Sequence, residues 1–478
     1  MACVPGAEEM LSIAKGSNNS SIGDDQVLMF CRSSADMLNG HLENYLPSSS
    51  IREQIGIVEC VSEEQSSNVT NYIRCLRNLC PDADHQSLIG ESTVVSSVAR
   101  LLHLLLAVSS HSTESFTHWP LVRVSLQLCG NLAVNSIDNV TVLWPLLFPH
   151  ILQFGISSTD DRTVNITAMV IDTCLAVDPS RRSYLHTDVT NGRPLLAKLL
   201  LATNERPELE FPLRLAEQLV SGDDFPALYS ALSDHIEARV VMVDLLNATL
   251  SDHTDSTASP STTATFQSGN AVFAETALFL AAQCGTCASK LPLTAPAVAH
   301  KTPHISLALS IIQYLSYLSS RMDGRHILLK YPKAFTAILD ALRRLTPAAA
   351  AVGSQADQTI YANEEEGKKS TYCGVKRDLV RCLANLMSLE PFKDQLCAEE
   401  GMSVLLNNCR VDHCNPYLGQ WSILAIHNAC ENHRGNQTVI ANLKKQGSAD
   451  VSLLRKMGMD VDISDDGTIR VKAASLPE

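Results

Sequence analysis

The stretch LVRCLANLM (379–387) decides the fold, because three other segments repeat its pattern: YIRCLRNLC (72–80), SLQLCGNLA (125–133) and SILAIHNAC (422–430). Each segment has an asparagine, with an apolar residue or cysteine five and two positions before it and one position after it; the asparagines are Asn78, Asn131, Asn385 and Asn428. These offsets place three apolar side chains on one face of a helix. The segments therefore predict four equivalent amphipathic helices.

The segments also recur at the period of a known repeat class. A second polar position follows each asparagine, at His85-Gln86, Asp138-Asn139, Asp394-Gln395 and Asn436-Gln437, and an apolar stretch comes next. The spacing from Asn385 to Asn428 falls within the roughly 40 to 47 residues of a HEAT or armadillo unit. Weaker copies of the pattern surround Thr173, Asn247 and Ser316. We predict an all-α fold, an armadillo/HEAT-like right-handed α-solenoid with a short C-terminal β-hairpin-like tail.

Breaks in the pattern divide the chain. We expect an N-terminal armadillo-like array at 1–250, a flexible Ser/Thr-rich linker at 251–269, a C-terminal array at 270–446 with a flexible insertion at 346–371, and a tail at 447–478. In the tail, apolar residues alternate on both sides of Asp466-Gly467, a dipeptide that favours a tight hairpin turn.

Composition excludes several classes of function. The 478 residues carry a formal net charge of −14, which opposes binding to nucleic-acid phosphates. The fifteen cysteines are scattered through apolar stretches, as expected for reduced thiols buried in a cytosolic or nuclear protein. The N-terminus has no secretory pattern, and the most apolar run, 98–108, is too short to cross a bilayer. We predict no membrane insertion and no nucleic-acid partner.

Catalytic and metal motifs receive little support. The chain has no Gly-X-Ser-X-Gly elbow, zinc-protease helix or dinucleotide fingerprint, and Gly367-Lys368-Lys369-Ser370 lacks the upstream glycine of a phosphate-binding loop. Cys284 and Cys287 have zinc spacing without a second ligand pair. A further cluster contains Cys409, His413, Cys414, His427 and His433, which are more readily explained as core and loop residues. We predict no enzyme activity, no metal and no cofactor.

The asparagines and the residues one turn before them have two interpretations. In an armadillo array, equivalent positions line the concave face, where Arg74, Gln127 and Arg381 would stand beside Asn78, Asn131 and Asn385, with Asn428 continuing the row. This partly cationic row would suit an acidic or phosphorylated peptide. In the other interpretation, which we favour, each asparagine bonds to the backbone of a neighbouring repeat and holds the stack. Importin-like transport adaptors, an alternative class, carry tryptophan where this chain has arginine, glutamine or, at 424, leucine.

Longer stretches resemble one family. KRDLVRCLANL (376–386), VDHCNPYLGQWSILAIHNACENHRGNQ (411–437) and GSADVSLLRKMGMDVDI (447–463) resemble the conserved C-terminal domain of the ataxin-10 family, and VRVSLQLCGNLAVNSIDNVTVLWP (122–145) resembles its N-terminal half. Within the C-terminal stretch we expect Pro416 to start a helix and Trp421 to anchor the domain core.

The resemblance implies a cytoplasmic armadillo protein, with positions near the nucleus, centrosome or ciliary base. It implies roles in neurite growth and neuron survival, cell division and ciliary base organisation. It also implies partners that include a protein glycosyltransferase and G-protein β subunits. Poorly capped repeat ends can self-associate, so a homo-oligomer is a further expectation. The predicted function is a non-enzymatic protein–protein interaction scaffold.

Overall fold

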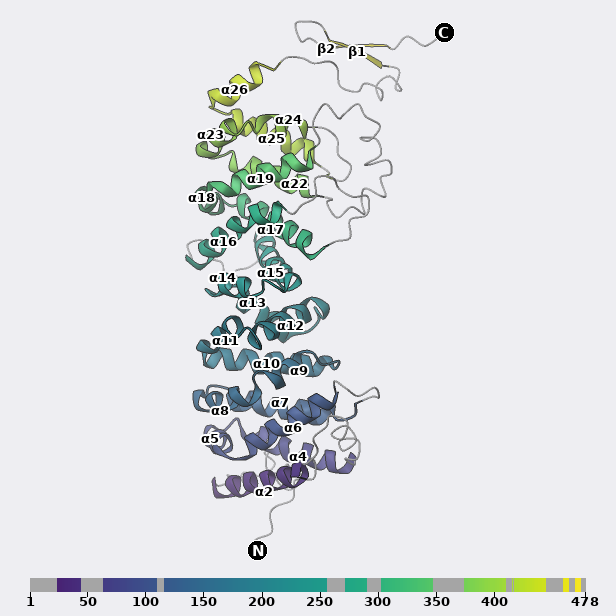
Figure 1. The fold of residues 1–478 in the computed structure, drawn as a ribbon, viewed down its shortest axis with the longest axis vertical. Coiled ribbons are helices and arrows are strands. Elements are labelled where there is room, and N and C mark those ends of the chain that lie inside the picture. Colours follow the sequence, from purple (N-terminus) through teal and green to yellow (C-terminus); the bar gives the residue numbers. More distant parts are fainter. Residues whose placement is uncertain are drawn as a thin grey trace, which may run out of the picture.

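The protein forms an elongated stack of short helices in a computed structural model (Figure 1). The structure describes residues 24–43, 63–109, 116–255, 271–289, 302–346, 374–409, 415, 417–443, 459–463 and 469–473. Within these residues the helices follow one another in sequence order along the long axis, from the N-terminal helices at one end to the C-terminal helices at the other. The predicted all-α solenoid of armadillo or HEAT type is confirmed.

The helices of the N-terminal half are α2 (Asp24–Glu43), α4 (Glu63–Leu79), α5 (Ala83–Glu91), α6 (Val94–Ser109), α7 (Trp119–Ala133), α8 (Ile137–Leu147), α9 (His150–Ile156), α10 (Asp161–Val177), the 3₁₀ turn η1 (Pro179–Arg181), α11 (Arg182–Thr187), α12 (Gly192–Glu205), α13 (Glu210–Val220), α14 (Phe225–Ala231) and α15 (Ile236–Asp255). Those of the C-terminal half are α16 (Ala271–Ala288), α17 (Pro303–Ser320), α18 (Met322–Leu329), α19 (Pro332–Leu345), α22 (Val375–Leu386), α23 (Glu390–Ala398), α24 (Met402–Asn407), α25 (Leu418–Cys430) and α26 (Arg434–Ala441).

Polar side chains cap the N-terminal ends of several of these helices. The Asp82 carboxylate accepts hydrogen bonds from the backbone N–H groups of residues 84 and 85 at the start of α5. Ser136 caps α8 and Asp160 caps α10 in the same way. Such side chains satisfy N–H groups that have no partner within the helix. Because these polar residues follow the end of a preceding helix closely, the chain turns sharply and stacks instead of forming long rods.

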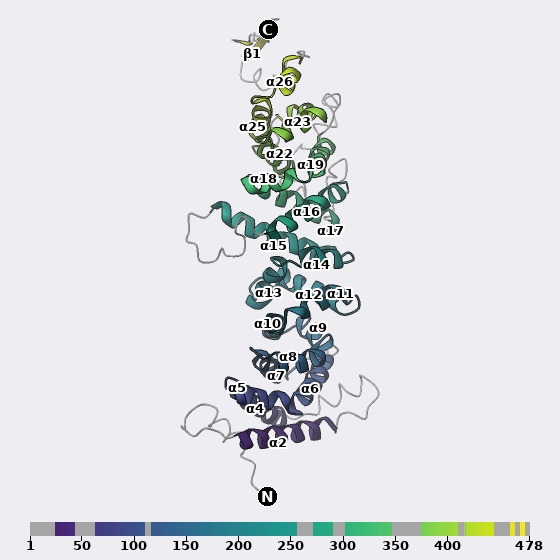
Figure 2. The same cartoon turned by 90° about the vertical axis from the view of Figure 1, so that its left-hand side faces the viewer.

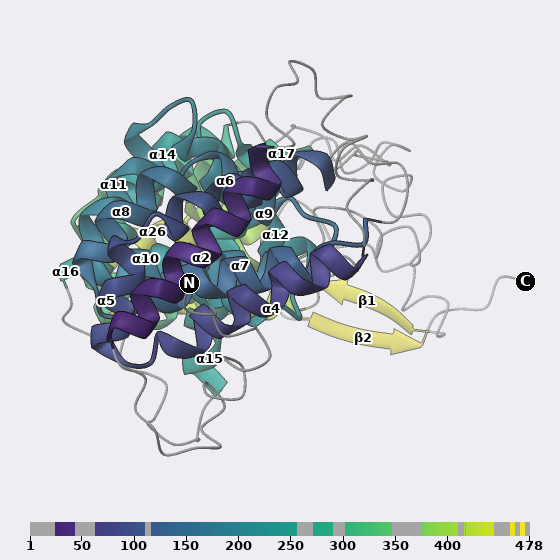
Figure 3. The ribbon, with the colours of Figure 1, turned by 90° about the horizontal axis from the view of Figure 1, so that it is seen from below.

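One row of helices runs the length of the stack. Each member packs on the next, and we call this set the ladder row: α4, α7, α10, α13, α15, α17, α22 and α25. Figure 2 shows its members following one another along the long axis, and Figure 3 shows the stack from its N-terminal end, with α2 and α4 nearest the viewer. The four quoted segments lie on α4, α7, α22 and α25. Thr173, Asn247 and Ser316 lie on α10, α15 and α17, so the weaker copies also belong to this row.

The core is continuous along the row. Buried residues form a single cluster that extends from Val27 in α2 to Ala429 in α25. The predicted apolar face is buried in α4, α7 and α22, where Ile73, Leu126 and Val380 are fully covered. The expectation is wrong for α25, because Ile423 at the same position is 61% exposed. In the part of the chain that the structure describes, α25 is the last helix of the row, so no later member covers this side.

The predicted domain boundaries need one correction. Helix α15 extends to Asp255, five residues into the expected linker at 251–269, and it packs against α17 on the far side of that linker. The rest of the linker lies outside the described residues, as does the insertion from residue 347 onward. The division into two arrays stays a prediction.

Near the C-terminus, β1 (Met459–Ile463) pairs antiparallel with β2 (Ile469–Ala473), with Val461 opposite Val471. These strands lie where the sequence alternates, while Asp466-Gly467 falls outside the described residues. Among the described helices, no single one is long and apolar enough to span a membrane. Two pairs of consecutive helices, α5 with α6 and α8 with α9, meet the length and composition criteria when taken together, but they are bent by 69° and 76°.

Candidate functional site

The predicted asparagines make contacts between neighbouring repeats. Asn131 on α7 donates through Nδ2 to the carbonyl oxygen of Arg77 on α4 (3.2 Å). Asn428 on α25 donates to the carbonyl of Ala384 on α22 (3.0 Å). In both cases the acceptor is the residue immediately before the asparagine of the preceding repeat. Asn385 donates instead to Ser319 Oγ of α17 (3.2 Å). Asn131 and Asn428 thus bond to the backbone of the neighbouring repeat, as the stacking interpretation expects, whereas Asn78 accepts hydrogen bonds from Arg77 of its own helix.

A second set of polar side chains stands eight positions after each asparagine and caps helix ends. Its members are Gln86, Asn139, Lys393 and Asn436. Asn139 donates to the carbonyl of Leu132 at 2.9 Å and Asn436 to that of Ala429 at 2.9 Å. Gln86 reaches the carbonyls of Asn131 and Val134, and Lys393 reaches that of Glu431. The last carbonyls of a helix have no partner within it, so these side chains satisfy the C-terminal ends of α7 and α25.

The sequence pattern predicts only part of this second set. Gln86, Asn139 and Asn436 belong to the predicted polar pairs, but the third pair, Asp394-Gln395, lies next to Lys393 and does not include it. Lys393 is only 6% exposed, and a buried lysine is rare enough that its fixed offset from Asn385 was a usable signal. Through these contacts the second set helps to hold neighbouring repeats together.

The residues one turn before the asparagines differ in their surroundings. Arg381 is largely held by α17: its Nε donates to Ser316 Oγ (2.7 Å), and its guanidinium lies 5.2 Å from the centre of the Tyr317 ring. Gln127 accepts a hydrogen bond from Arg77 Nη1 (2.6 Å). Arg74 is exposed and donates a hydrogen bond to Asn71 within its own helix. Of these three predicted positions, Arg74 is the one that presents a charged group to solvent.

The C-terminal core residues are placed as follows. Trp421 on α25 is partly buried and packs against the hydrophobic core, so it lies at the edge of the core instead of at its centre. Pro416 lies outside the described residues. Nearby, Tyr417 and Leu424 are exposed with Ile423, which makes this end of the stack apolar.

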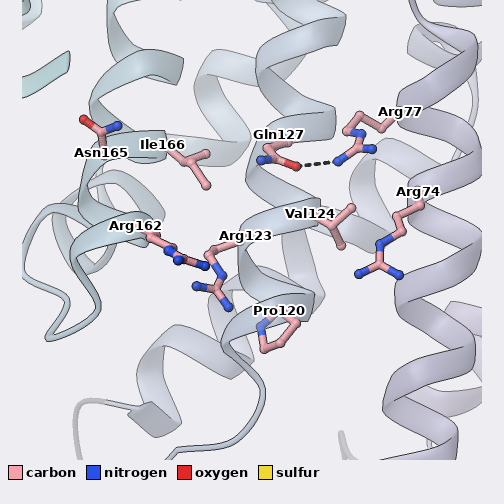
Figure 4. Close-up of a pocket in the computed structure, with 9 residues that line it drawn as sticks. All are labelled: Arg74, Arg77, Pro120, Arg123, Val124, Gln127, Arg162, Asn165 and Ile166. Atoms are coloured by element: carbon pink, nitrogen blue, oxygen red, sulfur yellow. Dashed lines mark hydrogen bonds between the residues drawn. The ribbon is translucent and has the colours of Figure 1, made fainter. Parts of the chain in front are cut away.

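A cavity of about 390 Å³ opens on the ladder row between α4, α7 and α10 (Figure 4). We call it the arginine cavity, because four arginines line it together with apolar and amide side chains: Arg74, Arg77, Pro120, Arg123, Val124, Gln127, Arg162, Asn165 and Ile166. No carboxylate is among these lining residues. Sequence reasoning found Arg74 and Gln127, but it missed the other three arginines because they stand at different helical offsets in each repeat.

The arginines of the cavity differ in their partners and exposure. Arg77 donates to Gln127 and, through Nη2, to Asn78 Oδ1 (2.9 Å), so two amide oxygens fix its guanidinium. Arg123 Nη1 lies 3.5 Å from Asp160 Oδ1. Arg162, the second residue of α10, is exposed. Burial lowers the pKa of Arg77, and the positive charge of Arg74 lowers it further. The cavity therefore concentrates positive charge that protein groups only partly neutralise.

The residues of the alternative metal and thiol sites that the structure describes are buried in the core or cap a helix. Cys284 and Cys287 are buried on α16, and burial raises the pKa of the Cys284 thiol, which disfavours the thiolate that zinc requires. His433 gathers with Glu390 and Asp394, but its Nδ1 accepts the backbone N–H of Asn436 and its Nε2 lies 3.1 Å from Asp394 Oδ1. His433 thus caps α26. His413, Cys414 and 367–370 lie outside the described residues.

Comparisons with known proteins agree on one family. The model of the spinocerebellar ataxia type 10 protein domain matches residues 375–472, from the start of α22 into β2. Ataxin-10 of Xenopus tropicalis is 26% identical over 408 residues, which are 84% of this chain and 79% of that protein. Ataxin-10 of Homo sapiens is 26% identical over 404 residues, 82% of this chain and 80% of that protein.

A further relative matches over a shorter stretch. The ataxin-10 homolog of Dictyostelium discoideum is 38% identical over 100 residues, 21% of this chain and 16% of that protein. Among solved structures, the crystal structure of an engineered protein aligns with 88% of this chain and 98% of its own, at 14% identity and a TM-score of 0.27. The domain match and the long alignments to curated relatives show that this chain is similar to the ataxin-10 family, both in the domain at 375–472 and over more than four-fifths of its length.

Proposed function

We propose that this chain is a non-enzymatic scaffold that binds partner proteins along the ladder row, with the arginine cavity as a principal contact. The observation that carries the proposal is the charge of this cavity. Four arginines line it, and among the described residues only Arg123 has a carboxylate partner, at 3.5 Å. Elsewhere on the row, the asparagines and the capping side chains are used to hold repeats together. A stack of this kind offers an extended surface, which suits partner binding better than it suits an enclosed reaction site.

The cavity charge also argues against the importin-like alternative. Arginine side chains repel the lysine-rich segments that such adaptors bind, whereas they attract carboxylates and phosphates. We further propose a cytoplasmic role in neurite growth, neuron survival, cell division and ciliary base organisation, which the similarity to the ataxin-10 family supports. A protein glycosyltransferase, G-protein β subunits and further copies of the chain are the proposed partners.

The test is co-purification from a lysate with cross-linking and mass spectrometry. The variant Arg74→Glu/Arg162→Glu reverses the two exposed charges of the cavity. The control Arg100→Glu/Lys198→Glu makes the same change in net charge at two exposed positions on α6 and α12. We expect a discrete set of partners that the wild-type chain and the control retain and the cavity variant loses, with cross-links near α4, α7 or α10.

The variants must first be shown to fold, by circular dichroism and a thermal unfolding curve that match the wild type. An identical partner set for all three folded proteins would refute a binding role for the cavity.

A further inference from the structure

The arginine cavity has a charge that the surrounding protein does not balance. Asp160 is the acidic group that pairs with a cavity arginine, and it also accepts hydrogen bonds from the N–H and hydroxyl of Thr163. The neighbouring Asp161 pairs with Arg206 at 3.4 Å, outside the cavity. The other three arginines have no carboxylate partner in the part of the chain that the structure describes. This excess is notable in a chain whose formal net charge is −14.

The cavity is also organised before any ligand arrives. Gln127 and Asn78 hold the Arg77 guanidinium by their amide oxygens, and these acceptors fix its direction without cancelling its charge. Figure 4 shows Arg123 and Arg162 extending toward each other from α7 and α10, while Arg74 and Arg77 project from α4 on the opposite side. A preorganised cation loses less side-chain entropy when an anion binds, which favours tighter binding.

The rest of the lining restricts the class of anion. Pro120, Val124 and Ile166 give the cavity an apolar part beside its cations, and no aromatic side chain is among the lining residues. Nucleic-acid bases normally stack on aromatic rings, so a nucleic acid has little to bind beyond charge. A peptide can place an anionic side chain among the arginines and an apolar neighbour against Val124 or Ile166.

The number of arginines distinguishes a phosphate from a carboxylate. A carboxylate carries one charge, whereas a phosphorylated serine or threonine carries close to two at pH 7 and offers three strong acceptor oxygens. Arginine pairs with phosphate through two parallel hydrogen bonds, and several arginines can share one phosphate. The phosphate group therefore satisfies more of this cavity than a single acidic side chain does.

We propose that the arginine cavity recognises a phosphorylated serine or threonine, next to an apolar residue, in an extended segment of a partner protein. This inference rests on the proposed scaffold function and names the chemistry of the segment that the scaffold selects. Binding would be controlled by the kinase and phosphatase that act on the partner.

The experiment uses the full chain and degenerate peptide libraries on beads, each with one fixed central residue: phosphoserine, serine or glutamate. At physiological ionic strength we expect the phosphoserine library to retain at least about tenfold more protein than the serine library, because one charge-assisted hydrogen bond contributes about that factor. Arg74→Glu/Arg162→Glu should reduce retention to the level of the serine library. Arg100→Glu/Lys198→Glu should retain the preference, and free inorganic phosphate should compete.

Three results would overturn the proposal: equal retention by phosphoserine and serine libraries, equal retention by phosphoserine and glutamate libraries, or a phosphoserine preference that persists in the folded cavity variant. The lysate experiment separates this failure from that of the scaffold function. Partners that still depend on Arg74 and Arg162 without phosphate selectivity would leave the scaffold function standing.

Discussion

At the scale of single residues, the repeats are joined by side-chain amides that reach backbone carbonyls. Asn139 is 4% exposed and donates to the carbonyls of Leu132 in its own repeat and Gln86 in the preceding one. Asn436 is fully buried and donates in the same way to the carbonyls of Ala429 and Lys393. Buried carbonyls that lose such a donor are left without a partner, which costs more than the hydrogen bond itself contributes. The surroundings of Asn139 are closely packed around its side-chain amide, and the neighbouring Gly90 shows this.

Replacing Gly90 by alanine is expected to destabilise the protein. A Cβ atom there would lie 1.8 Å from Asn139 Oδ1, so the Asn139 side chain must move and its hydrogen bond is lost. The expected loss is about 1–3 kcal/mol in the free energy of unfolding, measured by urea denaturation. Gly285→Ala is the matched control, because its Cβ would meet only Ala337 at 3.6 Å. Equal effects of the two substitutions would contradict the role given to Asn139.

The buried thiols are expected to make the protein less stable in alkali. Burial raises the pKa of Cys129 from 9.0 to about 12, so the folded state holds its proton more tightly than the unfolded state. This stabilisation is complete below pH 9 and is lost as pH rises toward 12. Between pH 8 and 10.5 the free energy of unfolding should fall more in the wild type than in Cys129→Ala, by roughly 1–2 kcal/mol. Parallel curves would argue that Cys129 does not titrate on unfolding.

At the scale of elements, the stack depends on contacts between consecutive ladder helices. Arg381 illustrates this: it belongs to α22, where it lies 4.0 Å from Asp378, but its hydrogen bond to Ser316 and its contact with the Tyr317 ring are with α17. Arg74 stands at the equivalent position of α4, and among the described residues its side-chain hydrogen bond is to Asn71 of its own helix. The same residue type at the same repeat position thus joins two helices in one place and faces solvent in the other.

This difference gives a direct comparison of two substitutions. Arg381→Ala should lower the free energy of unfolding by about 1–3 kcal/mol, since it removes a charge-assisted hydrogen bond and the packing on Tyr317. Arg74→Ala should change it by less than about 0.5 kcal/mol, as expected at an exposed site. Chemical denaturation of both variants is the measurement. A larger effect at Arg74 would mean that its position in α4 carries a structural contact.

At the scale of the whole molecule, the stack has one continuous core and an apolar C-terminal end. Residues at the same position of the repeat differ in burial there: Val380 of α22 is fully buried, whereas Ile423 of α25 is 61% exposed. A repeat protein buries each inner face against the next repeat, so the last helix of a row keeps an open side.

Truncating these two residues tests where the core ends. Val380→Ala should destabilise the protein by about 1–3 kcal/mol through lost burial and a residual cavity, while Ile423→Ala should cost less than about 0.5 kcal/mol. Thermal unfolding at low protein concentration is the measurement, so that association between molecules does not cover Ile423. A large loss at Ile423 under these conditions would show that another segment covers α25.

The sequence alone determined the class of fold and the position of most ladder helices, because stacking requires the same apolar offsets in every repeat and leaves a periodic signal. It located Asn131 and Asn428 and the polar positions that follow them, since a hydrogen bond repeated along the stack needs the same residue type at a fixed spacing. Where that constraint is absent, the signal is lost. Arg77, Arg123 and Arg162 occupy different offsets in α4, α7 and α10, and only the packing of these three helices brings them to one cavity.

Tertiary structure also decided which equivalent residues are free. Arg74 and Arg381 have the same place in the repeat, yet a serine and a tyrosine on α17 hold Arg381, whereas Arg74 faces solvent. Ile423 shares the pattern of Val380 but lies where the row ends. Periodicity reports what every repeat must do to stack on its neighbours. The identity of those neighbours, which sets burial and charge at each site, is a property of the assembled stack.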